Sequence, residues 1–228
     1  MDFTIPQHVQ NIAERVRQFV DREVLPIEKE IIQNQQELTA DMVNDLREKA
    51  KAEGLWAPTM SKDLGGMGLD IQEIIPVFEA AGRSLIGPLA VHASAPDEGN
   101  MHTLHLFADD AQTERYLKPL VAGDIYSGFS MTEPPPGAGS DPTMIQTTAT
   151  RDGDEWVING HKWYTTNGEI ADFLIIMAKS NPDAPAKNAC SLFLAPINTP
   201  GINIIRDVPT IGTKDFGGHV EILYEDVR

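Results

Sequence analysis

The spacing of apolar residues changes once along this chain of 228 residues, shortly after Gly123. Before this point apolar residues recur three or four positions apart with charged residues between them, which is typical of amphipathic helices. Beyond it the chain consists of short runs rich in Thr, Val, Ile, Tyr and Trp, which favour β-strands. We therefore predict a helical domain over residues 1–123 and a β domain, an antiparallel sheet or barrel, over residues 124–228.

Four segments of the first domain carry the helical pattern. They cover residues 7–32, 39–54, 71–81 and 109–117. Pro26 should kink or divide the first helix, because proline lacks the N–H that the helical hydrogen bonds need. Thr39 is a suitable N-cap for the second helix, and Gly54 is a suitable stop. Asp109, with Gln112 three residues later, has the form of a capping box at the start of the fourth helix.

Two turn dipeptides divide the first β-prone runs of the second domain. Asp152-Gly153 separates residues 144–150 from residues 155–158, and Asn159-Gly160 precedes residues 161–166. This spacing predicts two consecutive hairpins. Further strands are predicted over residues 173–178, 191–196, 202–206 and 219–224. The glycines within residues 64–68 follow no predicted strand, so we interpret them as a turn and not as a nucleotide-binding signature.

Charge and cysteine content exclude several classes of protein. The formal net charge of −16 leaves no dense basic face for nucleic acid or an anionic membrane. No stretch approaches the roughly 18 to 20 apolar residues of a membrane span, so we expect a soluble, cytoplasmic protein. The single cysteine, Cys190, excludes an intrachain disulfide and is expected to be a buried structural thiol. His92, His102 and His105 lack carboxylate partners at ligand spacing, so we predict no metal site.

Residues 129–141 have the sequence Phe-Ser-Met-Thr-Glu-Pro-Pro-Pro-Gly-Ala-Gly-Ser-Asp, which joins a β-prone run to a glycine-rich loop. Glycines let backbone N–H groups approach an anion closely, and prolines stiffen the loop. Thr132 and Ser140 add hydroxyl donors. The residues themselves leave two interpretations open: a loop that holds a phosphorylated cofactor, or an ordinary turn between strands.

A second motif, Gly-His-Lys-Trp-Tyr-Thr-Thr-Asn-Gly, occupies residues 160–168. Together the two motifs resemble the flavin-binding segments of the acyl-CoA dehydrogenase family. The resemblance extends to residues 58–68, 115–123 and 218–228, so it covers nearly the whole chain. It implies an α+β fold with an all-helical N-terminal domain, followed by a middle domain that is an antiparallel β-barrel or sandwich. It also implies FAD as the cofactor.

The resemblance further implies which residues bind the cofactor and the substrate. The cofactor-binding residues would be Phe129, Met131, Thr132, Gly137, Gly139, Ser140, Trp163, Tyr164, Thr165 and Thr166. Thr132 would lie at the pyrimidine edge of the flavin and Thr166 near its N5 atom. Ser140 would face the FAD diphosphate and also lie close to the bound acyl-CoA. Either Trp163 or Tyr164 would flank the ring, because Tyr164 stands where the family has a tryptophan.

The chain departs from the family pattern in two further places. Pro135 and Pro136 are inserted into the first motif, which changes the path expected for the diphosphate loop. The family's catalytic glutamate belongs to a C-terminal helical domain that this sequence lacks, so we assign no residue of the chain as the base. We interpret Glu133, in the first motif, as a structural carboxylate.

The activity implied by the resemblance is the FAD-dependent α,β-dehydrogenation of an acyl-CoA thioester to a trans-2-enoyl-CoA. An electron-transfer flavoprotein would accept the electrons, and the full-length protein would be a homo-oligomer. The 228 residues by themselves are expected to be inactive, because they would form only the flavin-facing part of the site. Two alternatives stay open: a flavin-dependent acyl-CoA oxidase or oxygenase of the same fold, and a non-catalytic module that binds acyl-CoA or a partner protein.

Overall fold

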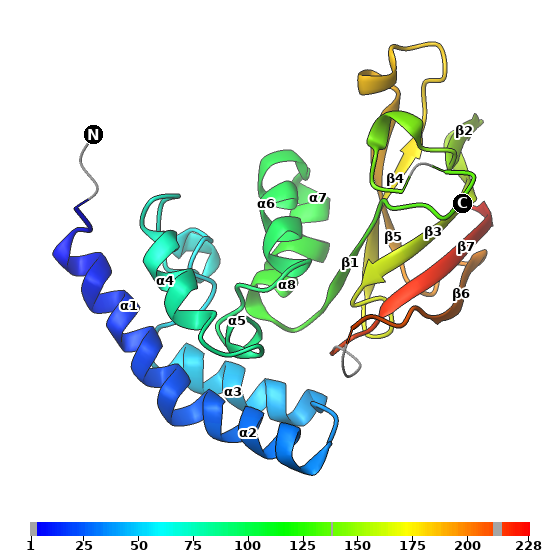
Figure 1. The fold of residues 1–228 in the computed structure, drawn as a ribbon. Helices are drawn as coiled ribbons and strands as arrows, with labels where there is room; N and C mark the ends of the chain where they lie inside the picture. Colours follow the sequence, from blue (N-terminus) through cyan, green and yellow to red (C-terminus); the bar gives the residue numbers. More distant parts are fainter. Residues whose placement is uncertain (1–3, 138, 212–215) are drawn as a thin grey trace. The chain divides into compact units, whose positions relative to one another are not determined.

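The computed structural model describes residues 4–137, 139–211 and 216–228. The chain forms two compact units, Met1–Asp124 and Ile125–Arg228 (Figure 1). The described part of the first unit is helical and that of the second is built from strands, so the predicted fold class is confirmed. No helix among the described residues is long and apolar enough to cross a membrane.

The helical segments of the first unit follow one another with short connections. They are α1 (Gln7–Phe19), a π-helical turn (Val20–Val24), α2 (Leu25–Asn34), α3 (Ala40–Ala52), a 3₁₀ turn (Lys62–Leu64), α4 (Ile74–Ala81), α5 (Gly87–Ala90), α6 (Asp97–Phe107), α7 (Asp110–Gln112), a second π-helical turn (Thr113–Leu117) and α8 (Lys118–Ala122). All four predicted helical segments are confirmed. The glycines within residues 64–68 form a turn after the 3₁₀ segment, as expected.

Each π-helical turn is followed, after one intervening residue, by a proline. Pro26 is the second residue of α2, and Pro119 is the second residue of α8. A proline in a helix lacks its N–H and its ring crowds the carbonyl group four residues earlier. A wider π turn, closed by the Leu25 N–H on the Val20 oxygen in the first case, is a known site of bending in helices. The predicted division of the first helix at Pro26 is therefore confirmed, and the distortion lies upstream of the proline.

Capping follows the sequence prediction, whereas helices α5 and α6 lie outside the predicted segments and α8 follows the end of the fourth one. The Thr39 hydroxyl accepts a hydrogen bond from the backbone N–H of Met42 at 3.3 Å, and Asp109 and Gln112 form the predicted capping box. Helix α6 was not predicted. Two of its buried residues are Asp97 and Asn100, so its inward face is partly polar and shows no continuous apolar stripe.

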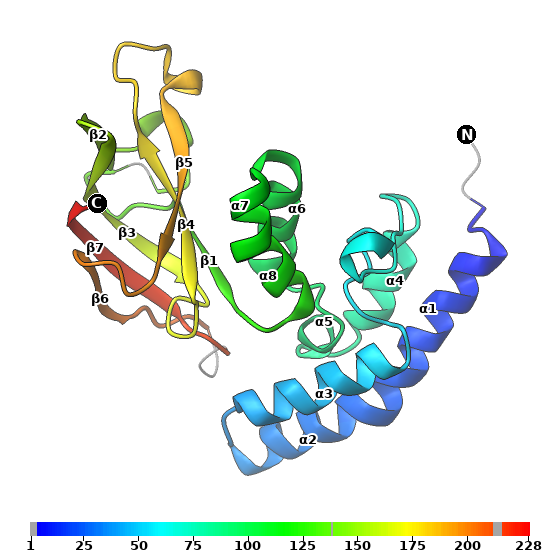
Figure 2. The same cartoon turned by 180° about the vertical axis from the view of Figure 1, so that it is seen from behind.

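The second unit contains β1 (Ser127–Ser130), β2 (Thr148–Asp152), β3 (Glu155–Thr166), β4 (Phe173–Lys179), β5 (Cys190–Pro196), β6 (Ile202–Asp207) and β7 (His219–Val227), with 3₁₀ turns at Pro142–Met144 and Ala186–Asn188. These strands form one sheet in the order β1-β4-β2-β3-β7-β6, and β5 also pairs with β4. Figure 2 shows β3, β7 and β6 side by side. The core of the sheet includes Leu174, Ile176, Val220, Ile222 and Tyr224.

The sheet is mixed, which corrects the expectation of a purely antiparallel one. β1 and β2 both pair with β4 in parallel, and the other neighbouring strands are antiparallel. Parallel pairing needs a long crossover. The chain between β1 and β4 provides one, because it holds the glycine-rich loop and the hairpin of β2 and β3. Short-range pattern alone could not reveal this pairing.

The second predicted hairpin is wrong, because β3 runs without interruption through Asn159 and Gly160. A β-bulge lies there against β7, between Ile158 and Gly160. A Cβ atom at Gly160 would stand 2.2 Å from the Thr147 hydroxyl oxygen. The glycine thus permits a close approach of two segments and forms no turn. The first hairpin, at Asp152-Gly153, is confirmed.

The expectation that Cys190 is a buried thiol is wrong, and His92 has a fully buried ring. Cys190 is half-buried rather than buried, and its Sγ lies 3.8 Å from the Pro142 carbonyl oxygen. His92 is only 1% exposed and its ring stacks on Trp56 with centroids 4.5 Å apart. Its Nε2 lies 2.8 Å from the Leu120 carbonyl oxygen. Burial, aided by the positive charge of Arg47, lowers the pKa of His92 from 6.5 to about 3.

This lowered pKa predicts an acid sensitivity of the first unit. Between pH 6.5 and about 3 the unfolded chain binds a proton at residue 92 that the folded chain does not bind. The contribution of His92 to the free energy of unfolding is therefore fully present above pH 6.5. Below that pH it falls by at most about 1.4 kcal/mol per pH unit. Urea unfolding of His92→Asn across this range should show a shallower pH dependence. Asparagine tolerates the left-handed backbone at residue 92, and an unchanged slope would contradict the prediction.

Candidate functional site

The first motif leaves the sheet at the end of β1 and forms a closed loop. The Glu133 N–H donates to the Gly139 carbonyl oxygen at 3.0 Å, and the Gly137 N–H donates to the Pro134 carbonyl oxygen at 2.9 Å. Beyond the loop, the Asp141 carboxylate accepts from the Thr143 N–H at 2.9 Å and starts the turn Pro142–Met144. The loop thus has a defined path on both sides of Ala138, which lies outside the described residues.

A buried ion pair joins the loop to the second motif. Lys162 has no exposed surface and Glu133 is 3% exposed, and the Lys162 Nζ lies 2.9 Å from the Glu133 Oε1. The same Nζ donates to the Met131 carbonyl oxygen at 2.8 Å. One residue further along β3, the Trp163 N–H donates to the Thr132 carbonyl oxygen at 3.0 Å. The two motifs are therefore joined by side-chain and backbone contacts.

The Glu133 carboxylate is fully engaged by its surroundings. It accepts hydrogen bonds from the Thr147 N–H at 2.9 Å, the Thr147 hydroxyl at 2.6 Å and the Gln146 N–H at 2.7 Å. Burial raises the pKa of this carboxyl, but the hydrogen bonds from Thr147, Gln146 and Lys162 outweigh burial and leave the pKa below its usual value. Burial lowers the pKa of Lys162, and Glu133 opposes that effect. Glu133 therefore has the structural position expected of it.

A second bulge in β3 decides which way the second motif faces. The register with β7 shifts between Lys162 and Thr165, and Tyr164 has a left-handed φ of 53°. Lys162 and Thr165 both lie in the core, although they are three residues apart. Tyr164 is 43% exposed, and its ring meets that of Trp163 edge-on with centroids 5.0 Å apart. The bulge thus presents an aromatic ring outward between two inward side chains.

The two threonines of the motif have different surroundings. Thr165 is fully buried, and its hydroxyl shares a hydrogen bond of 3.2 Å with Ser130. Ser130 also lies 2.7 Å from the Tyr224 hydroxyl, whose pKa burial raises, so that it stays protonated. Thr166 is half-buried, and its hydroxyl shares a hydrogen bond of 2.9 Å with the Nδ1 of His219. Thr166 therefore stands nearer the surface than Thr165.

The remaining predicted residues differ in their exposure. Phe129, Met131, Thr132, Gly137 and Gly139 are half-buried, and Ser140 is exposed. Within the described part of the chain, the Thr132 hydroxyl has no hydrogen-bond partner. Two residues were missed by the site prediction although they stand within or beside the motifs: Lys162 and His219. A lysine within an otherwise apolar-facing strand was the available signal for Lys162; His219 is brought to Thr166 only by the pairing of β3 with β7.

The described residues of each unit line a cavity. One of about 350 Å³ lies beside the loop, against residues 133–137 and His161. The His161 Nε2 lies 2.8 Å from the Glu221 Oε1, and Arg206 donates to the other oxygen of that carboxylate at 2.6 Å. No group of three metal-ligating side chains occurs among the described residues.

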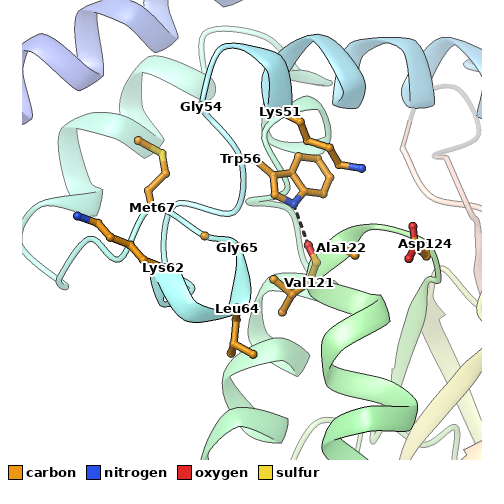
Figure 3. Close-up of a pocket in the computed structure, with 11 residues that line it drawn as sticks. Lys51, Gly54, Trp56, Lys62, Leu64, Gly65, Met67, Val121, Ala122 and Asp124 are labelled. Atoms are coloured by element: carbon orange, nitrogen blue, oxygen red, sulfur yellow. Dashed lines mark hydrogen bonds between the residues drawn. The ribbon is translucent and has the colours of Figure 1, made fainter.

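The other cavity, of about 630 Å³, belongs to the first unit (Figure 3). Trp56 lies between the Gly65 loop and the end of α8, and its Nε1 donates to the Val121 carbonyl oxygen at 2.8 Å. The ammonium group of Lys51 stands 4.7 Å from the centroid of the Trp56 ring. The residues predicted from the two motifs all belong to the second unit, whereas the residues that line this cavity belong to the first.

The two units correspond to two known domain families. The model of the acyl-CoA dehydrogenase N-terminal domain matches residues 6–124, and the model of the acyl-CoA dehydrogenase middle domain matches residues 128–227. The chain belongs to the acyl-CoA dehydrogenase family. The family resemblance of the two motifs is thereby confirmed.

Individual relatives agree with this assignment. The chain is 44% identical over 190 residues to the Mycobacterium tuberculosis protein named "Probable acyl-CoA dehydrogenase FadE2", covering 82% of this chain and 46% of the relative. It is 37% identical to mouse acyl-CoA dehydrogenase family member 10, covering 96% of this chain and 22% of that protein. The chain thus spans less than half the length of these curated relatives.

Solved structures of the family share the fold. A Mycobacterium abscessus structure assigned as an acyl-CoA dehydrogenase superposes with a TM-score of 0.88 at 36% identity, covering 98% of this chain and 59% of that one. The FAD complex of PigA superposes with a TM-score of 0.81 at 28% identity, covering 100% of this chain and 57% of PigA.

The buried ion pair yields a stability prediction. Lys162→Met should lower the free energy of unfolding by about 3–5 kcal/mol, because it leaves the Glu133 charge buried and unpaired. Urea unfolding measures the loss. Arg228→Met is the control, since Arg228 makes exposed ion pairs with Asp152 and Glu155 and its removal should cost far less. An equal loss of unfolding free energy in the two variants would show that the buried Lys162–Glu133 pair stabilises this unit no more than an exposed ion pair does.

Proposed function

We propose that this chain holds FAD and forms the flavin-facing part of an enzyme that converts an acyl-CoA thioester to a trans-2-enoyl-CoA. Membership of the acyl-CoA dehydrogenase family supports the reaction class. The FAD complex of PigA, which shares the fold, supports the cofactor. The observation that carries the proposal is the Thr132 hydroxyl, which has no hydrogen-bond partner among the described residues. Its residue pairs with the Trp163 N–H, next to the exposed ring of Tyr164.

The residues present suit a flavin. Its pyrimidine edge is rich in acceptor atoms and its ring is flat and apolar on both faces, so a pocket for it needs free donors and an aromatic or aliphatic wall. Thr132 supplies the donor, and Tyr164 supplies an exposed ring in a strained backbone conformation of the kind that clusters at functional sites. The Trp163 Nε1 is buried without an acceptor among the described residues, which marks a further unused donor in this wall.

Each residue then has a separate task. FAD, when bound, supplies the acceptor for the hydride that leaves the substrate β-carbon. Thr132 would hold the pyrimidine edge of the flavin, Tyr164 would pack against its ring, and Thr166 would provide a hydroxyl near its N5 atom. Ser140 is exposed at the end of the loop, where it would face the diphosphate and the acyl-CoA. Thr165 contributes through its backbone, because its side chain belongs to the core.

The Glu133 carboxylate, in the first motif, is not the proton-abstracting base. Glu133 cannot serve, because its two oxygens are occupied by Thr147, Gln146 and Lys162 and it carries 3% exposure. We propose that the base lies outside these 228 residues, that an electron-transfer flavoprotein reoxidises the enzyme, and that the active protein is a homo-oligomer. The family assignment supports these three statements.

The protein expressed from its complete reading frame provides the direct test. It should show a flavin absorbance spectrum that bleaches when an acyl-CoA is added without oxygen, with the matching enoyl-CoA as product. A panel of acyl chain lengths then identifies the substrate. Rapid reoxidation of the reduced protein in air would contradict the dehydrogenase assignment and indicate an oxidase or oxygenase. Tight acyl-CoA binding without a flavin spectrum would indicate a non-catalytic module.

A single substitution tests the role of Thr132. Thr132→Val removes a donor while keeping the side-chain shape, and it should weaken FAD binding about fivefold, which corresponds to about 1 kcal/mol for one hydrogen bond. Fluorescence titration of the protein with FAD measures the change. Thr148→Val, an exposed threonine on β2, is the matched control and should leave FAD binding unaltered. Equal FAD affinity in both variants would remove Thr132 from the site.

A further inference from the structure

We infer that Lys162 is a positioning residue for the cofactor, which it reaches through the peptide between Met131 and Thr132. Its ammonium group holds the Met131 carbonyl inward, so that the Thr132 N–H points outward as a fixed, polarised donor. The inference rests on the proposed FAD site, and it assigns to the buried ion pair a task beyond joining the two motifs.

The orientation follows from the planarity of the peptide bond. In a trans peptide the C=O and the N–H point in opposite directions. The Met131 carbonyl accepts from the Lys162 Nζ at 2.8 Å, on the inner side of the loop. The N–H of the same peptide, which belongs to Thr132, must therefore point away from Lys162. No backbone acceptor among the described residues takes this N–H.

The next peptide obeys the same rule and shows that the loop is held at two successive points. The Thr132 carbonyl accepts from the Trp163 N–H at 3.0 Å. Its partner N–H, that of Glu133, points the other way and donates to the Gly139 carbonyl oxygen at 3.0 Å. Successive residues of β3 thus fix successive peptides of the loop. The outward N–H and the hydroxyl of Thr132 form a pair of donors on one residue.

Stability alone does not explain a charged pair at this place. Replacing a buried ion pair by apolar residues of similar volume is often neutral or stabilising, because both charges must be removed from water. Lys162 has no exposed surface, and a methionine would fill much of its volume. A cation behind the peptide has a second effect, since in a low-dielectric interior it polarises the peptide and strengthens the donor on the far side.

This effect matters most when the bound group gains negative charge. Reduction of a flavin increases the charge at its pyrimidine edge, so donors and cations near that edge stabilise the reduced form. Lys162 should therefore raise the reduction potential of the bound flavin. Glu133 should oppose it in part, but its charge is shared with the donors of Thr147 and Gln146.

Three variants separate positioning from stability, with the two-electron potential of the bound flavin and urea unfolding as readouts. Lys162→Met should lower the equilibrium constant for reduction about tenfold, equivalent to about 30 mV. Glu133→Gln should lose stability without a lower potential, because the lysine donor remains. The double variant, Lys162→Met with Glu133→Gln, buries no unpaired charge. It should regain stability and keep the lowered potential.

A control variant and a measurement without flavin show which results would contradict the inference. Arg228→Met, which removes an exposed ion pair of the same unit, should leave the potential at the wild-type value. A double variant that regains both stability and potential would overturn the inference, since the pair would then act only in folding. In the cofactor-free protein, the amide ¹⁵N resonance of Thr132 should shift in the double variant and not in Arg228→Met; no shift would also overturn it. Wild-type protein that takes up no FAD would reject the proposed function, whereas the amide resonance tests the peptide contact without flavin.

Discussion

The buried contact between Glu133 and Lys162 is the interaction on which the rest of the second unit depends. Its two residues are 29 positions apart in sequence and belong to different motifs, so the contact joins the two motifs directly. The carboxylate orders residues 146 and 147, which lead into β2, and the ammonium group orders the loop after β1. A charged pair demands correct geometry, because an unpaired charge in the core is costly. The contact therefore fixes the loop, the start of the hairpin and β3 relative to one another.

Because of its bulges, strand β3 breaks the strict alternation of inward and outward side chains. Lys162 and Thr165 point into the core, where Thr165 meets Ser130, and Tyr164 is left at the surface in a left-handed conformation. A regular strand would alternate its side chains strictly and could not bury residues three apart on one face. The strain at Tyr164 is offset by the buried contacts on both sides of it. The outward position of Tyr164 is thus a consequence of how the core is packed.

Much of the local structure was predictable because it depends on neighbours in sequence. The Thr39 cap, the Asp109 capping box and the Asp152-Gly153 hairpin involve residues at most a few positions apart, and all three were confirmed. The failures have a common origin in distant contacts. Helix α6 buries polar residues. Gly160 forms no turn and instead leaves room for the close approach of Thr147. Local rules could not distinguish a turn glycine from one required by a neighbouring segment.

The sequence by itself determined the order of a helical and a β domain, the membership of the acyl-CoA dehydrogenase family and the two motifs that contribute to the candidate flavin wall. These properties reside in periodicity and in short runs of residue types. Only the tertiary structure decided that β1 and β2 pair in parallel with β4. It alone also decided that Thr165 faces the core while Tyr164 faces outward, and that Lys162 donates to the Met131 carbonyl oxygen. Each of these depends on which distant segments meet and on the side from which they meet. That information is absent from any single stretch of chain, because it arises when buried polar groups must find partners across the fold.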